Sequence, residues 1–122
     1  MSAKVLVVDD SGLARRSTRR VLEAAGYTVL EAEDGLSALE RYFVDKPDVV
    51  LLDLVMKGMY GLDVLTKLRE MDPTARVIVI SADIQTSSRE LVSAGGASGF
   101  LTKPARPDDI VAAVRTAIEG TA

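Results

Sequence analysis

A short apolar run followed by a segment with helical spacing occurs five times along this chain of 122 residues. The apolar runs are 4–8, 27–32, 49–52, 77–80 and 99–102. The helical segments that follow them are about 12–25, 35–46, 61–71, 84–94 and 107–119. Parallel neighbouring strands need a crossover connection, which is usually a helix. The alternation therefore predicts one α/β domain with a five-stranded parallel sheet, five helices and right-handed crossovers.

Polar side chains follow four of these apolar runs. They are Asp9 and Asp10, then Asp53, Ser81 and Lys103. The carboxyl ends of parallel strands share one edge of a sheet, and ligands bind there at the point where the winding direction reverses. In the flavodoxin-like strand order 2-1-3-4-5, the first and third strands flank that point. We therefore expect three carboxylates to meet closely, with a hydroxyl group and an ammonium group beside them.

Composition narrows the chemistry that this edge can carry. The chain has no histidine and no cysteine, which excludes Ser-His-Asp catalysis, disulfides and zinc held by cysteine. Any metal must be held by oxygen atoms, which favours a hard cation such as Mg²⁺. The net charge of −3 argues against general nucleic-acid binding. No apolar stretch is long enough to cross a bilayer and no signal peptide precedes the first strand, so we expect a cytoplasmic protein.

Three carboxylates in one pocket repel one another unless a cation compensates their charge. Magnesium accepts carboxylate ligands and commonly shares its site with phosphate oxygens. Lys103 would add a positive charge for an anion, and Ser81 would add a hydroxyl group. Asp53 stands alone at the end of its strand, so it is the natural nucleophile and would form an aspartyl phosphate.

The ordered set of motifs resembles a response-regulator receiver domain of two-component signalling. The matching residues are Val8-Asp9-Asp10-Ser11, Leu52-Asp53-Leu54-Val55-Met56, Gly61, Ser81-Ala82 and Gly99-Phe100-Leu101-Thr102-Lys103-Pro104. The resemblance covers essentially the whole of residues 1–122. We expect a receiver domain without an effector domain, similar to single-domain chemotaxis regulators, and a fragment of a longer regulator is the alternative.

The resemblance assigns the metal and the phosphoryl group to individual residues. It implies that Asp53 is the phosphoacceptor. It also implies that Asp10, Asp53 and the backbone carbonyl of Val55 bind Mg²⁺ directly, while Asp9 acts largely through water.

Further roles are implied around the last strand. Ser81 and Lys103 would contact the phosphoryl group. Phe100 matches an aromatic residue that changes rotamer on activation, so Ser81 and Phe100 would form a switch that alters protein–protein binding. The bond between Lys103 and Pro104 is expected in cis.

Membership of this family would also define the partners. The phosphoryl group would come from a sensor histidine kinase or a histidine phosphotransfer protein, and the output would be binding to an unidentified protein. Chemotaxis regulation and a phosphorelay are both open. A monomer is the default state, and dimerisation through the fourth helix, fifth strand and last helix on activation is the alternative. Such a domain takes part in its own phosphorylation and dephosphorylation but is not a turnover enzyme.

Each of these residues also has a simpler interpretation. Asp9, Asp10 and Ser11 suit the cap of the first helix, as Ser81 suits the cap of the fourth. Asp53 alone suits a turn, Lys103 alone suits a solvated loop, and Phe100 alone suits the core. The arginines of the first helix suit a solvated face, with a docking patch for an acidic partner as the alternative. They are Arg15, Arg16, Arg19 and Arg20.

Two other functions compete with phosphorylation signalling. A Mg²⁺-dependent phosphatase with an aspartyl nucleophile usually needs a second Asp two residues later, and Val55 occupies that position. A flavodoxin-like cofactor binder needs a loop rich in Ser, Thr or Gly after the first strand. Asp9 and Asp10 would instead repel a cofactor phosphate.

Overall fold

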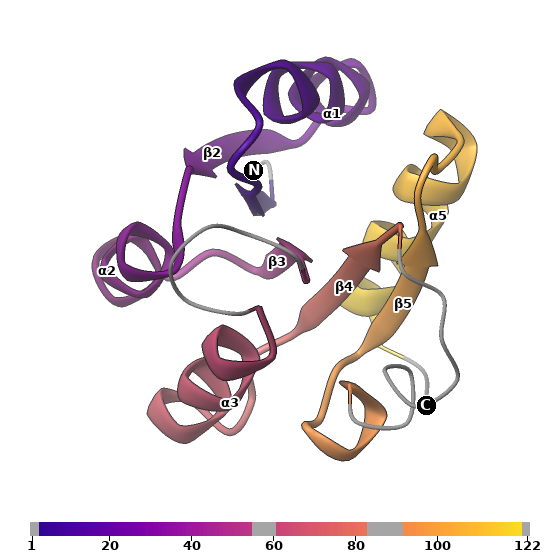
Figure 1. Cartoon of the computed structure of the whole chain (residues 1–122). Coiled ribbons are helices and arrows are strands. Elements are labelled where there is room, and N and C mark those ends of the chain that lie inside the picture. Colours follow the sequence, from indigo (N-terminus) through magenta and orange to yellow (C-terminus); the bar gives the residue numbers. More distant parts are fainter. Residues whose placement is uncertain (1–2, 55–60, 83–91, 121–122) are drawn as a thin grey trace.

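The structure, a computed structural model, describes residues 3–54, 61–82 and 92–120. Strands and helices alternate through these ranges (Figure 1). The strands are β1 (Lys4–Val8), β2 (Thr28–Ala32), β3 (Val49–Asp53), β4 (Val77–Ser81) and β5 (Gly99–Thr102). The helices are α1 (Gly12–Ala24), α2 (Gly35–Asp45), α3 (Gly61–Met71) and α5 (Pro107–Glu119). Most of the helix predicted at 84–94 lies outside the described residues, and its last part, 92–94, is helical.

All neighbouring strands of the sheet are parallel, and their order is β2-β1-β3-β4-β5. This order confirms the predicted 2-1-3-4-5 arrangement. Val8 pairs with Leu52, Leu52 with Val79 and Val79 with Phe100, so the strands end at nearly the same level. The register therefore brings the residues at the four strand ends to a common edge.

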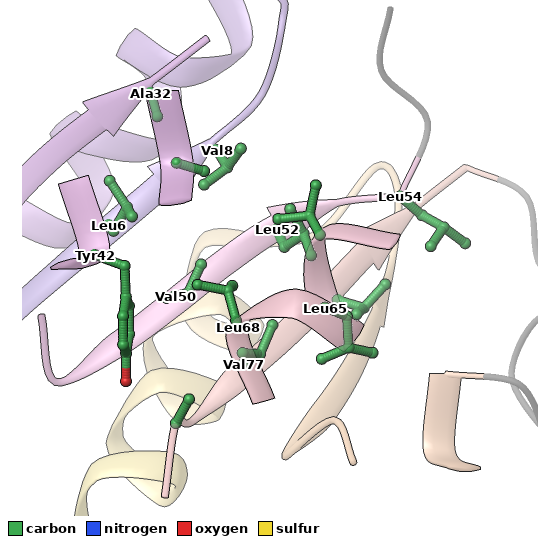
Figure 2. Packing of buried hydrophobic residues seen from close by; sticks show 14 of the residues in the cluster. Leu6, Val8, Ala32, Tyr42, Val50, Leu52, Leu54, Leu65, Leu68 and Val77 are labelled. Carbon is green, nitrogen blue, oxygen red and sulfur yellow. The ribbon is translucent and has the colours of Figure 1, made fainter. Parts of the chain in front are cut away.

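The two faces of the sheet have separate hydrophobic cores. Leu6, Val50 and Leu52 point toward α2 and α3, where Figure 2 shows them packed with residues such as Leu65 and Leu68. Alternate side chains of the same strands belong to the core beneath α1 and α5. Figure 1 shows the two helix pairs on opposite sides of the sheet.

Both cores explain the apolar strand sequences. Successive side chains of a strand point to opposite faces, so a strand that is covered on both faces is apolar at every position. Val5 and Val7 pack in the core beneath α1 and α5, while Leu6 and Val8 pack in the core beneath α2 and α3. Each fully buried aliphatic side chain contributes about 1.5–3 kcal/mol.

Helix starts are fixed by local hydrogen bonds and by one close backbone approach. Ser11 and Asp34 cap α1 and α2 by accepting hydrogen bonds from the amides of Ala14 and Ser37. At Gly61, a Cβ atom would lie 2.6 Å from the Cα of Leu54. Glycine there lets the start of α3 lie directly against the chain that leaves β3.

None of the helices that the structure describes is long and apolar enough to span a membrane.

Candidate functional site

The polar residues at the strand ends gather at the carboxyl edge of the sheet. Asp53 and Ser81 are the last residues of β3 and β4, one position further into the strands than the sequence suggested. Asp9 follows β1, and its amide donates to the carbonyl of Ala32 at 3.2 Å. Asp9, Asp53 and Ser81 are buried, whereas Asp10 is exposed.

Carboxylate oxygens of Asp9, Asp10 and Asp53 all lie within 4.8 Å of one another. These three residues and Lys103 are called the acidic cluster below. Opposite ligands of a small octahedral cation are separated by roughly 4.2 Å, which is twice the metal–oxygen distance. The three carboxylates therefore need only small side-chain movements to hold a hard divalent cation.

Lys103 enters the cluster from the loop after β5. Its ammonium group donates to Oδ2 of Asp9 at 2.9 Å and to Oδ2 of Asp53 at 3.0 Å. Its backbone amide donates to the carbonyl of Ser81 at 2.8 Å, which ties the loop to the end of β4. The following bond, Lys103–Pro104, is cis. Lys103 thus joins the ends of β1 and β3 across the carboxyl edge.

Opposing effects act on the charge of Lys103. Partial burial favours the neutral amine and lowers its pKa. Hydrogen bonds to Asp9 and Asp53, together with their negative charges, outweigh this effect, so the pKa of Lys103 lies above its ordinary value. The lysine is therefore charged at neutral pH. Three carboxylates and one ammonium group leave two negative charges, which a divalent cation would balance.

The proposed switch residues lie on neighbouring strands. Ser81 is fully buried and pairs in register with Thr102. Phe100 is half-buried and packs against the core beneath α2 and α3. The core interpretation of Phe100 thus describes its position in this structure. Val55, the expected source of a backbone ligand, lies outside the described residues.

The capping role that the sequence offered for Asp9, Asp10 and Ser11 falls to Ser11. The hydroxyl group of Ser11 caps α1 by accepting from the amide of Ala14 at 3.2 Å. Asp9 does not serve as the helix cap. Its Oδ1 accepts from the amide of Ser11 at 2.9 Å, while its Oδ2 faces Lys103.

Arg15 corrects the expectation that all four arginines of α1 lie on a solvated face, because its side chain is only 17% exposed, whereas that of Arg19 is 43% exposed. Arg15 donates to Oε1 of Glu31 at 3.1 Å and to the carbonyl of Asp9 at 2.6 Å. Arg19 donates to Oε2 of Glu31 at 2.7 Å and to Glu23 at 3.1 Å. The hydrogen bonds from Arg19 and Arg15 hold the pKa of Glu31 below its ordinary value, and they outweigh desolvation, which acts to raise it.

The contact between Arg15 and Asp9 was missed because helical periodicity identifies a polar face but not its tertiary partners. A usable signal was the position of Arg15 in the first turn after the two acids, together with Glu31 within the otherwise apolar second strand. Arg16 and Arg20 are exposed, as the solvated-face interpretation requires.

Comparison with known proteins places these features in a family. Residues 5–115 match the model of the response regulator receiver domain. The chain is 36% identical over 115 residues to the chemotaxis protein CheY of Thermotoga maritima, covering 93% of this chain and 96% of that protein. The crystal structure of the chemotaxis protein CheY4 of Vibrio cholerae superimposes with a TM-score of 0.91 at 28% identity, covering 96% and 99% of the two chains.

The chain therefore belongs to the response regulator receiver domain family. It is also 37% identical over 121 residues to the response regulator MprA of Mycobacterium ulcerans, covering 99% of this chain but 52% of MprA. The chain thus spans about half the length of several curated relatives that it matches. Receiver domains are partners of histidine kinases and are not turnover enzymes.

Proposed function

We propose that residues 1–122 form one receiver domain, in which Asp53 accepts a phosphoryl group and Mg²⁺ is the cation held by Asp9, Asp10 and Asp53. The observation that carries this proposal is the geometry of Lys103. Its ammonium group lies within 3.0 Å of both Asp9 and Asp53, in a cluster that still has an excess of negative charge. Such a site favours a divalent cation together with an anionic group.

The residues of the cluster divide the chemistry between them. An oxygen of Asp53 attacks the phosphorus atom, and the bond from phosphorus to the donor breaks. Magnesium, when bound, neutralises the phosphoryl oxygens and orients them. Lys103 is placed to exchange its bond with Asp53 for one to a phosphoryl oxygen. Asp9 and Asp10 contribute charge without taking part in the covalent step.

The transmitted signal is proposed to run through Ser81 and Phe100. Ser81 lies at the carboxyl edge and Phe100 lies on the adjacent strand. A contact between the Ser81 hydroxyl group and the phosphoryl group can therefore alter the packing of Phe100. Val55 would supply a backbone carbonyl to Mg²⁺. The protein is proposed to act in the cytoplasm as a monomer when it is not phosphorylated.

Sensor histidine kinases and histidine phosphotransfer proteins are the proposed donors. The output would be binding to a protein target, as expected for a relative of CheY, or transfer of the phosphoryl group along a relay. Transfer of label from Asp53 to histidine on a second protein would distinguish a relay. Stable binding of a target to the phosphorylated form would identify the other output.

Phosphorylation by a small-molecule donor tests the assignment of Asp53. Acetyl phosphate with Mg²⁺ should add one phosphoryl group to the wild-type protein, detected by intact mass. Asp53→Asn should abolish the addition because it removes the nucleophilic oxygen while preserving shape. Chelation of Mg²⁺ should abolish it in the wild type.

Asp63→Asn provides a matched control because Asp63 is an exposed carboxylate in the first turn of α3. This variant should be phosphorylated like the wild type. Undiminished phosphorylation of Asp53→Asn would show that another residue is the acceptor.

A further inference from the structure

We propose that Arg15 is a positioning residue for the metal site, acting through the peptide that joins Asp9 to Asp10. This inference rests on the proposed function, since it concerns how the carboxylates are held for Mg²⁺. The guanidinium group does not belong to the acidic cluster. It contacts the backbone of the cluster at the carbonyl of Asp9, which directly precedes Asp10.

Arg15 reaches this peptide from the first turn of α1. Its Nη1 donates to the carbonyl oxygen of Asp9 at 2.6 Å, and its Nε donates to Glu31 at 3.1 Å. The side chain is only 17% exposed. A planar guanidinium group held by a carboxylate at one nitrogen presents its other nitrogens in a fixed direction. Glu31 therefore orients Arg15, and Arg15 orients the carbonyl of Asp9.

Asp10 follows this peptide directly in the chain, so its position depends on how the carbonyl of Asp9 is held. The amide of Asp9 is held by Ala32, and its carboxylate accepts from Ser11 and Lys103. Asp10 lies in a bend beyond the end of β1 and is exposed. The plane of the peptide between the two residues sets the direction in which the Asp10 backbone continues, so a fixed carbonyl helps to keep its carboxylate near Asp53.

The charge of Arg15 and its positioning role predict opposite effects of its removal on metal binding. Arg15 is a cation close to the site, so its removal should strengthen the binding of Mg²⁺ if only Coulomb repulsion mattered. The positive charges of Arg15 and Arg19 are also matched by Glu23 and Glu31 in the same network. A loss of Mg²⁺ affinity on removal of Arg15 can therefore be assigned to geometry.

The test is calorimetric titration of the metal-free protein with Mg²⁺. Arg15→Ala should raise the Kd for Mg²⁺ by roughly tenfold, the lower end of the range for removal of an outer partner of a metal ligand. Arg15→Lys keeps the charge but loses the planar fork, so it should also raise the Kd. Glu31→Gln should raise it by less, because the guanidinium group remains but loses its anchor.

Two control variants separate positioning from charge and from stability. Arg20→Ala removes an exposed arginine from the same helix, for which the described residues provide no ion pair, and should leave the Kd unchanged or slightly lower. Tyr42→Phe removes a hydrogen bond to Asp72 on the other side of the molecule. It should destabilise the fold without changing the Kd.

A second readout needs no metal. The amide signal of Asp10 in ¹H–¹⁵N spectra should shift in Arg15→Ala and remain in place in Arg20→Ala. An unchanged Kd in Arg15→Ala, or an unchanged Asp10 signal, would overturn the inference while leaving the proposed function intact. If Arg15→Ala does not fold, Arg15→Lys decides in the same way. A wild-type protein that fails to bind Mg²⁺ would overturn both proposals.

Discussion

The acidic cluster at the carboxyl edge of the sheet can be compared with the contact between Tyr42 and Asp72 at the amino edge. Both place carboxylates beside buried groups. At Asp72, one carboxylate oxygen accepts from the hydroxyl group of Tyr42 at 2.8 Å. The other accepts from the amide and the hydroxyl group of Thr74 at 2.9 and 2.6 Å. Neutral donors thus surround a single negative charge.

The acidic cluster has a different balance of negative and positive charge. Lys103 pairs with Asp9 and Asp53, and the three carboxylates of the cluster outnumber its one ammonium group, so the excess charge of the cluster is negative. At Asp72, hydrogen bonds from Thr74 and Tyr42 suffice to lower the pKa of the carboxyl group. Burial raises the pKa of Tyr42, and the negative charge of Asp72 raises it further. We infer that the amino-edge contact stabilises the fold, whereas the carboxyl edge retains charge for a ligand.

Replacement of Lys103 should produce the largest effect. Lys103→Met should slow phosphorylation by acetyl phosphate at least about a hundredfold, because a preorganised charge next to the reacting group is lost. Stability should fall by only about 1–2 kcal/mol, because the two lost hydrogen bonds to carboxylates come from an ammonium group that is partly open to solvent. Rates come from intact mass against time, and stability comes from urea unfolding.

Lys67→Met is the matched control because Lys67 is exposed on α3. It should change neither quantity appreciably. A Lys103→Met variant that is phosphorylated at the wild-type rate would contradict the distinction between the two edges.

Tyr42→Phe should lower stability and leave phosphorylation unchanged, in contrast to Lys103→Met, which should mainly slow phosphorylation. Loss of the hydrogen bond to Asp72 should lower the free energy of unfolding by about 1 kcal/mol. The rate of phosphorylation and the Kd for Mg²⁺ should stay at wild-type values, because the ring still fills the core beneath α2 and α3. Urea unfolding and labelling of the same preparation provide the measurements. A large loss of phosphorylation would show that the two edges are coupled.

Acid should produce the smallest effect, and its sign follows from Asp72. The pKa of this carboxyl group is lowered in the folded protein, so its contribution to stability is present above its ordinary pKa of about 4. That contribution is lost as the pH falls through the folded pKa. The stability difference between wild type and Tyr42→Phe should therefore shrink when urea unfolding is measured at about pH 3 instead of pH 7. An equal difference at both pH values would contradict this explanation.

The fold and the acidic cluster could be predicted because their determinants are local in sequence. The apolar runs of β1, β3 and β4 are buried on both faces, and each of these runs is followed by a polar side chain. Parallel pairing then brings Asp9, Asp53, Ser81 and Lys103 to one edge. Some predicted bounds differed by one residue, as at β3 and β4, where Asp53 and Ser81 continue the ladder as its last residues.

Contacts between distant polar side chains could not be predicted in the same way. The periodicity of α1 correctly placed Arg15 on the polar side, yet it did not reveal that the side chain turns back to Glu31 and Asp9. In the sequence, Asp72 directly precedes Pro73, which indicates a helix end but no partner for the carboxylate. Its pairing with Tyr42 depends on how α2 and α3 lie against each other.

The close approach at Gly61 has a consequence for genetic screens of this protein. A side chain at this position would lie 2.7 Å from the carbonyl oxygen of Asp53 and would push on the backbone of the proposed acceptor. Substitutions of Gly61, which has no functional side chain, would thus be as damaging in such a screen as substitutions of Asp53. A map of positions that do not tolerate substitution would then include the first residue of α3 together with the residues of the site.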